Sequence, residues 1–318
     1  MTEMTRSAPL VRMQREAKGS LWRAFRRNSW MYLMLLPGLV YYALFNYAPM
    51  FGVLVAFKKF NAFVGFWESP WVGLKHFQTF FDSIYFTRLL GNTLILNLYG
   101  LIVGFPIPII FALMLNEVTR PLFKRLVQTV SYLPFFISTT IVASLLYSFL
   151  NKDAGMVNYI IGLLGLERVD FLSRSEWFRH IYVWSDVWQW TGWTAVIYLG
   201  ALTAIDPTLY ESAEIDGAGR LAKMWHISIP GILPIIMIML LLSLGNLLSI
   251  GFEKVYLLYN ERTYETADVI ATYVFRAGIQ GGRYDFATAV GLFNSAVNFT
   301  LLVAFNWIAG RARQQTLW

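Results

Sequence analysis

The chain has 318 residues, of which 57% are hydrophobic and only 14% are charged. Soluble domains average about 25% charged residues, so this composition is typical of an integral membrane protein. The net charge is +7, and cysteine is absent, which excludes disulfides, thiolate metal sites and cysteine nucleophiles. The three histidines, His76, His180 and His226, are scattered without ligand spacing. We therefore predict no metal site in this chain.

Six apolar stretches are long enough to cross a bilayer, whose core takes about 20 helical residues. They lie at residues 30–57, 89–115, 130–150, 181–205, 229–252 and 287–309. Pro37 and Pro49 predict that the outer end of the first span bends or leaves the membrane early, and Pro106 and Pro108 interrupt the second. The predicted fold is an all-α integral membrane protein with six transmembrane helices.

Charge sets the orientation of these spans. Residues 1–29 carry seven Lys or Arg side chains against two acids, so the positive-inside rule keeps this segment in the cytoplasm. The segment is too long for a cleaved signal peptide, and whether it is ordered or lies along the membrane surface stays open. Six spans then place the tail, residues 310–318, in the cytoplasm as well. The predicted inside segments hold 14 Lys and Arg against 12 in the outside segments, a difference too small to fix the orientation. The orientation therefore rests on the N-terminal cluster of basic residues.

The polar stretch 206–228 falls between the fourth and fifth predicted spans, on the cytoplasmic side. Asp206 is suited to cap a helix that starts at the following proline. Gly217 accepts the positive φ that a sharp turn needs. A short second helix is expected over residues 220–226, and Pro230 begins the next span. The local prediction is a compact helix–turn–helix knob with charges of both signs.

Residues 211–230 resemble the EAA signature of the membrane subunits of binding-protein-dependent ABC importers. The matching positions are Glu211, Ala213, Gly217, Ile227 and Pro230, whereas Ser212 and Ile229 depart from the usual Ala and Leu. The resemblance implies a type I ABC importer permease fold in the bacterial cytoplasmic (inner) membrane. It makes the knob a cytoplasmic coupling helix that docks into the ATPase subunit. Its coupling candidates are Glu211, Ala213, Asp216, Gly217, Arg220 and Pro230, and the alternative is an ordinary cytoplasmic loop.

Further segments are similar to the subgroup of this family that imports complex sugars. These are residues 57–61 and 71–77, Asn92-Thr93-Leu94, and residues 284–293. The similarity implies an importer of an oligosaccharide or polysaccharide, possibly an acidic one such as alginate. It divides the chain into a first helix with its outer loop at 30–88 and a core permease domain at 89–309.

The sequence contains no Gly-x-x-x-x-Gly-Lys-Ser/Thr phosphate-binding motif. No cofactor is therefore expected in this chain, and ATP and Mg would be bound by a separate ATPase. The resemblance implies two ATPase subunits, a second permease that we expect to be a different homologous chain, and a periplasmic or extracellular solute-binding protein. The chain is also expected to contact a carbohydrate substrate and membrane lipid. No binding to nucleic acid is expected.

Polar and aromatic side chains inside the predicted spans are candidates for the substrate pathway, since such groups are costly in a membrane. They are Tyr147, Gln189, Trp190, Trp193, Asn246, Asn294 and Asn298. Tryptophan rings would stack on sugar rings and amides would read hydroxyl groups. Helix packing and interhelical hydrogen bonds are the structural alternatives for the same residues.

Two other functional classes fit these residues less well. An ion-coupled secondary transporter of sugars would need ionisable groups within the membrane or inverted repeats, and Asp186 is the only ionisable residue in a predicted span. A membrane-embedded transferase would need clustered catalytic groups, whereas the acids of residues 153–176 are interleaved with arginines as in a solvated loop. The predicted spans also hold no cation to balance an acidic sugar, so such a cation would have to come from the outer loops, a partner permease or the binding protein.

Overall fold

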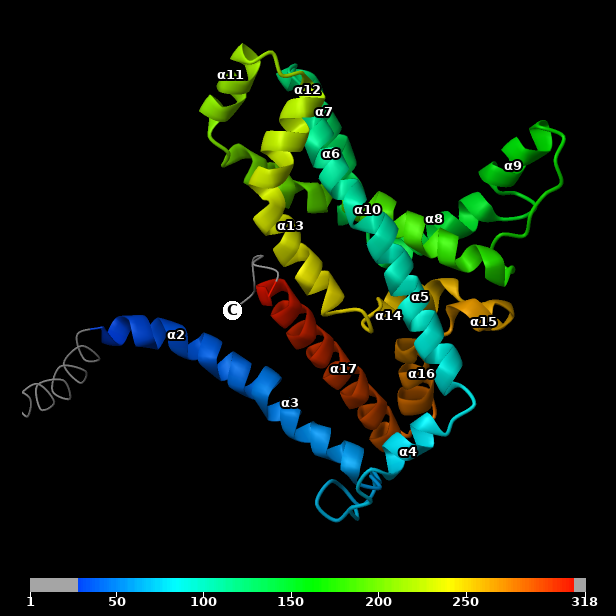
Figure 1. Cartoon of the computed structure of the whole chain (residues 1–318). Helices are drawn as coiled ribbons and strands as arrows, with labels where there is room; N and C mark the ends of the chain where they lie inside the picture. Colours follow the sequence, from blue (N-terminus) through cyan, green and yellow to red (C-terminus); the bar gives the residue numbers. More distant parts are fainter. Residues whose placement is uncertain (1–27, 312–318) are drawn as a thin grey trace, which may run out of the picture. The chain divides into compact units, whose positions relative to one another are not determined.

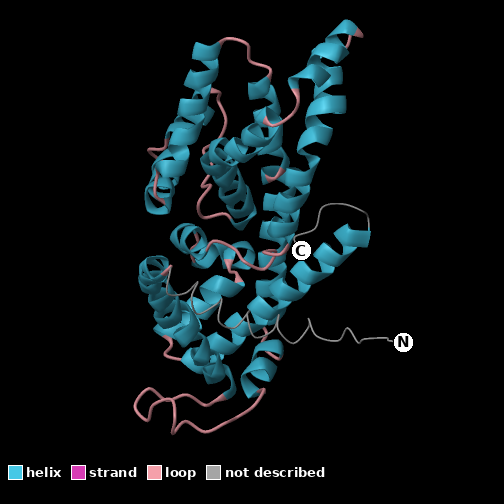
Figure 2. Cartoon of the chain, turned by 90° about the vertical axis from the view of Figure 1, so that its left-hand side faces the viewer, coloured by secondary structure: helices cyan, strands magenta, loops and turns pink. Residues whose placement is uncertain are grey.

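A computed structural model describes residues 28–311 (Figures 1 and 2). Within this range all the regular elements are helices. The only β-type pairing among the described residues is a single antiparallel bridge between Lys58 and Trp71. The all-α prediction is therefore confirmed. Nearly all of the expected N-terminal basic segment and C-terminal tail lie outside the described residues. The chain divides into two compact units with the boundary between Leu54 and Val55, inside the expected 30–88 segment.

The first unit is one apolar helical run that continues to Phe57 in the second. It comprises α2 (Ser29–Tyr42), a π-helical turn (Ala43–Tyr47), α3 (Ala48–Met50) and a 3₁₀ turn (Phe51–Phe57). Pro49 has no N–H to donate, and its ring crowds the backbone carbonyl one turn earlier. The wider π-helical turn, Ala43–Tyr47, lies at that carbonyl and gives the ring room. Residues 28–54 bury no side chain within the chain, which fits a helix whose surroundings are lipid or another subunit.

The second unit contains the remaining helices. In chain order these are α4 (Lys75–Phe81), α5 (Phe86–Gly104), α6 (Pro106–Asn116), α7 (Pro121–Tyr132), α8 (Thr139–Leu150), α9 (Met156–Leu163), α10 (Ser175–Thr203), α11 (Pro207–Ile215), α12 (Arg220–Lys223), α13 (Ile229–Leu244), α14 (Phe252–Leu258), α15 (Tyr264–Ala267), α16 (Ile270–Phe275) and α17 (Tyr284–Arg311). Figure 1 shows α11 and α12 at one end of this unit and α4 and α16 at the other.

Four helical runs among the described residues are long and apolar enough to cross a membrane. They are Ser29–Phe57, Phe86–Asn116, Arg220–Leu244 and Tyr284–Arg311. The stretch expected as one span at 130–150 is instead a helix pair, Pro121–Phe136 and Thr139–Leu150, bent by 99°. Pro134 lies in the short 3₁₀ turn before the bend, and Ser138 caps α8 by accepting from the N–H of Ile141. The chain thus has the means to end one helix and start another at this point.

The fourth expected span corresponds to α10, a 29-residue helix that is too polar to meet the same apolar criterion. It is the central helix of the unit and packs against α5, α6, α7 and α13. Ala195 and Tyr198 of α10 join Ala112 and Ile232 in a buried core between α6 and α13. Contacts with neighbouring helices, rather than lipid, therefore cover much of its surface.

The fifth expected span ends earlier than residue 252, because α13 stops at Leu244. Gly245 follows, and a side chain there would press into Leu302 of α17. The chain then turns through residues 246–251 before α14 begins. At the far end of α17, Phe80 of α4 packs edge-on against Phe286 and Phe293, which fixes α4 on this helix.

Candidate functional site

The knob folds as its residues predict. The Asp206 carboxylate accepts from the backbone N–H of Thr208 at 2.9 Å and caps α11. This bond to the charged carboxylate lowers the pKa of Asp206. Gly217 then turns the chain at a φ of +78°, in the left-handed region that favours glycine. The helix after the turn begins at Arg220.

The helix that follows differs from expectation. Instead of ending near Pro230, it runs without a break from Arg220 to Leu244. A π-helical turn, Met224–Ser228, precedes the proline and gives its ring room where a regular α-helix would clash. Knob and span therefore share one helix of 25 residues, about 37 Å long at 1.5 Å per residue.

Two side-chain contacts join α11 to this long helix. Lys223 donates to the carboxylate of Glu214, and this hydrogen bond together with the positive charge lowers the pKa of Glu214. The hydroxyl groups of Tyr210 and Ser228 lie 2.9 Å apart. These contacts attach α11 to the long helix at two points one helical turn apart.

The outer surface of the knob is exposed. Glu211, Asp216 and Arg220 face solvent, and Ala213 is half-buried. Beside them the apolar side chains Ile215, Leu221 and Trp225 are also exposed, Ile215 by 87%. Exposed apolar groups rimmed by charges mark an interaction surface more often than a free loop.

A cavity of about 730 Å³ lies within the second unit. Its wall comes from α5, α6, α10, α13 and the turn after α13. Two predicted pathway residues, Trp190 and Asn246, line it. The wall also contains polar side chains that the sequence did not single out: Asn97, Thr191, Thr194, Ser243 and Ser249. Helical periodicity alone does not distinguish these residues from the other polar residues of the predicted spans, so the sequence could not assign them to the cavity.

The other predicted pathway residues lie outside this wall. Gln189 donates to the carbonyl of Ile137, and Tyr147 to that of Leu257. Trp193 stacks on Phe135 with ring centroids 4.3 Å apart. These contacts connect neighbouring helices. They therefore match helix packing and interhelical hydrogen bonding, the structural alternative to a place in the substrate pathway.

The two asparagines of α17 also lie outside the cavity wall. Asn298 accepts from the N–H of Leu248 and donates to Ser249, so it supports the turn after α13 from behind. The side-chain oxygen of Asn294 is buried without a hydrogen-bond partner among the described residues.

An ion pair at the cavity was missed from the sequence. Lys254 of α14, placed in an outer segment by the span prediction, donates to Asp186 of α10 at 2.6 Å. Asp186 lines the cavity, whereas Lys254 lies behind it. A cation is thus available beside the cavity, and it comes from one of the segments outside the predicted spans, which were one of the expected sources. The signal was not local, because 68 residues separate the two partners.

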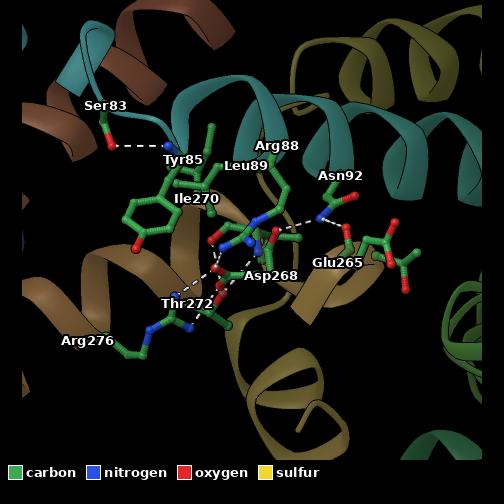
Figure 3. A network of polar contacts seen from close by, with 12 residues as sticks. Ser83, Tyr85, Arg88, Leu89, Asn92, Glu265, Asp268, Ile270, Thr272 and Arg276 are labelled. Carbon is green, nitrogen blue, oxygen red and sulfur yellow. Dashed lines mark hydrogen bonds and ion pairs between the residues drawn. The ribbon is translucent and has the colours of Figure 1, made fainter. Parts of the chain in front are cut away.

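A second polar network joins the N-terminal part of α5 to the residues that flank α16 (Figure 3). The fully buried carboxylate of Asp268 accepts two hydrogen bonds from Arg276, at 2.7 and 2.8 Å, and one from Arg88 at 3.3 Å. Burial acts to lower the pKa of Arg276, but the bonds to Asp268 outweigh it and raise that pKa. Asn92 of α5 donates to the backbone carbonyls of Glu265 and Asp268.

Replacing Asp268 by asparagine is expected to destabilise the protein by about 3–5 kcal/mol, because it leaves two arginines beside a buried neutral group. The thermal midpoint of the detergent-solubilised protein measures this. Glu261→Gln, which changes an exposed acid seven residues earlier in the chain, is the matched control and is expected to leave the midpoint unchanged. An equal midpoint for both variants would contradict the structural role of the network.

Comparison with known proteins decides the family. Residues 104–314 match the family described as "Binding-protein-dependent transport system inner membrane component". The chain belongs to this family. It is a multi-pass inner-membrane permease subunit of an ABC importer, and ATP hydrolysis belongs to a separate subunit.

Relatives of this permease cover it almost end to end. It is 44% identical to protein LplB of Bacillus subtilis (strain 168), over 98% of both chains. It is 43% identical to the polygalacturonan/rhamnogalacturonan transport system permease protein YteP of the same organism, over 97% of this chain and 96% of the relative.

Solved structures agree with the fold. The permease resembles a chain in the crystal structure of a bacterial ABC transporter involved in the import of the acidic polysaccharide alginate. The TM-score is 0.86 at 44% identity, over 92% of this chain and 99% of that one. A second structure, of an alginate ABC transporter with its pentasaccharide-bound periplasmic protein, gives the same TM-score at 43% identity. In the described part of the permease, no group of three or more His, Asp or Glu side chains is placed to hold a metal ion.

Proposed function

We propose that this permease imports an oligosaccharide or polysaccharide delivered by a solute-binding protein. It would pair with a second, homologous permease and be driven by two ATPase subunits, which bind the ATP and Mg. The names of its relatives support a carbohydrate cargo: YteP is named for polygalacturonan and rhamnogalacturonan, and the solved neighbours for alginate.

The proposed topology has six spans with both termini in the cytoplasm. The bent α7–α8 pair and the polar α10 would supply the two spans beyond the four apolar runs. Residues 206–228 would then form the cytoplasmic coupling helix, and residues 89–309 the core permease domain. Their position supports this, because α11 and α12 lie at the end of the unit opposite α4 and α16 (Figure 1).

One observation carries the proposal most strongly. The helix that starts in the knob at Arg220 also supplies Met239, Leu242 and Ser243 to the cavity wall. A displacement of the knob by an ATPase is therefore passed to the cavity by a single helix, with no loop between them. Coupling then consists of a shift between two arrangements of the helices, and no chemistry is done on the substrate.

Reconstitution with purified partners tests the function. The permease is isolated in mild detergent with its co-purifying proteins, which mass spectrometry identifies, and the complex is placed in liposomes with the solute-binding protein. ATP-dependent uptake of an oligosaccharide and the presence of a second permease with an ATPase are expected. An isolated chain, or uptake driven by an ion gradient without ATP, would instead support a secondary transporter.

Trp190 lines the cavity and offers an aromatic face at which a sugar ring can pack. Trp190→Ala is expected to lower uptake about fivefold to tenfold, equivalent to roughly 1 kcal/mol of lost contact, while basal ATP hydrolysis persists. Trp188→Ala removes a tryptophan from the same helix that is outside this cavity, and normal uptake is expected. Equal uptake by both variants would contradict a contact between Trp190 and the sugar and would indicate that Trp190 only packs against neighbouring helices.

A further inference from the structure

The Lys254–Asp186 pair is asymmetric with respect to the cavity. The Lys254 side chain is 5% exposed, and its ammonium lies 5.4 Å from the ring centroid of Tyr182. The Asp186 side chain is 36% exposed and forms part of the cavity wall. The carboxylate therefore faces the space where a substrate would pass, and the cation is hidden behind it.

Charge in this cavity depends on that pair. Among the described residues that line it, Asp186 is the only charged one. The rest of the polar lining consists of amides and hydroxyls, which bind sugar hydroxyl groups without selecting for charge. Without Lys254, a lone carboxylate would face the cavity, and its repulsion of another carboxylate would be stronger there than in water.

We propose that Lys254 sets the charge selectivity of the cavity by neutralising Asp186, so that sugar chains bearing carboxylates are admitted. This inference rests on the proposed import of a carbohydrate, and it assigns the residue pair that lets an acidic cargo, a uronate oligosaccharide, pass the cavity. Lys254 acts through Asp186 as a positioning residue and need not touch the substrate.

Uptake of an oligogalacturonate or oligoalginate by the reconstituted complex tests the proposal. Lys254→Met is expected to raise the apparent KM for the acidic substrate at least tenfold, with basal ATP hydrolysis unchanged. Added salt should reduce this defect, because it screens the exposed carboxylate. Asp186→Asn leaves the ammonium unpaired and should lower the apparent KM. The double variant, with neither charge, is expected to regain a KM within about threefold of the wild type. Lys152→Met, at an exposed loop position, is the matched control.

The possible outcomes distinguish a failure of the proposed function from a failure of the role assigned to Lys254. A wild-type complex that imports no oligosaccharide overturns both the proposed function and this inference. A functional wild type whose Lys254→Met variant keeps a normal KM overturns the inference alone. A double variant as impaired as Lys254→Met also overturns the inference. An Asp186→Asn variant that loses kcat and basal hydrolysis at a constant KM does so as well. Both results are what a purely structural ion pair would give.

Discussion

Replacing Gly217 by proline is expected to abolish substrate-stimulated ATP hydrolysis and to reduce uptake below about a tenth of the wild-type rate. Gly217 has a φ of +78°, whereas proline holds φ near −65°. The turn between α11 and α12 therefore cannot form, and the knob loses its shape. Membrane insertion should survive, because the turn buries no side chain of the spans. Hydrolysis by the reconstituted complex, with and without loaded solute-binding protein, measures the effect.

The neighbouring glycine provides the control. Gly219 has a φ of −72°, close to the value that proline imposes. Gly219→Pro is therefore expected to retain most of the stimulation. Normal stimulation in the Gly217→Pro variant would contradict the coupling role of the knob.

Replacing Gly192 by alanine is expected to destabilise the protein by about 3 kcal/mol or more, the upper range for overpacking a core. A Cβ at Gly192 would overlap the backbone carbonyl of Ser131, so α10 or the end of α7 must move. Backbone atoms on both sides leave no flexible side chain to give way. The thermal midpoint of the purified complex should fall by about 6 °C or more.

Gly200 lies on the same helix and has open space around its Cβ position. Gly200→Ala removes backbone freedom without a clash, so a small gain of about 0.5–1 kcal/mol is expected. A Gly192→Ala variant as stable as Gly200→Ala would show that α10 does not pack on Ser131 as described.

The elements that follow from local chemistry could be predicted from the sequence. The cap by Asp206, the positive φ at Gly217 and the apolar runs at both ends of the chain each depend on a few adjacent residues. The helical continuity from the knob into α13 could not be predicted, because a proline such as Pro230 ordinarily ends a helix. The π-helical turn before it compensates, and nothing in the sequence requires that turn.

Features that depend on distant partners were also beyond the sequence. Asp186 and Asp268 each look like an isolated acid until the fold brings Lys254, Arg88 and Arg276 to them. The same holds for the cavity, where Trp190 is on the wall and Trp193, three residues away, stacks on Phe135. Spacing along α10 separates these two faces, but only the packing of α5, α7 and α13 decides which of them meets the cavity.

Cross-linking from the knob tests the central claim, that an ATPase drives this permease through residues 206–228. The chain has no cysteine, so Ser212→Cys on the exposed face of α11 gives one thiol, which adds to a benzophenone maleimide. On illumination the benzophenone ketone inserts into a C–H bond of the adjacent subunit, so the partner needs no thiol. Lys152→Cys, in the exposed loop before α9, is the control. A covalent adduct with the ATPase subunit is expected from position 212 and not from position 152. Efficient cross-linking from position 152 alone would place the ATPase away from the knob and contradict the account.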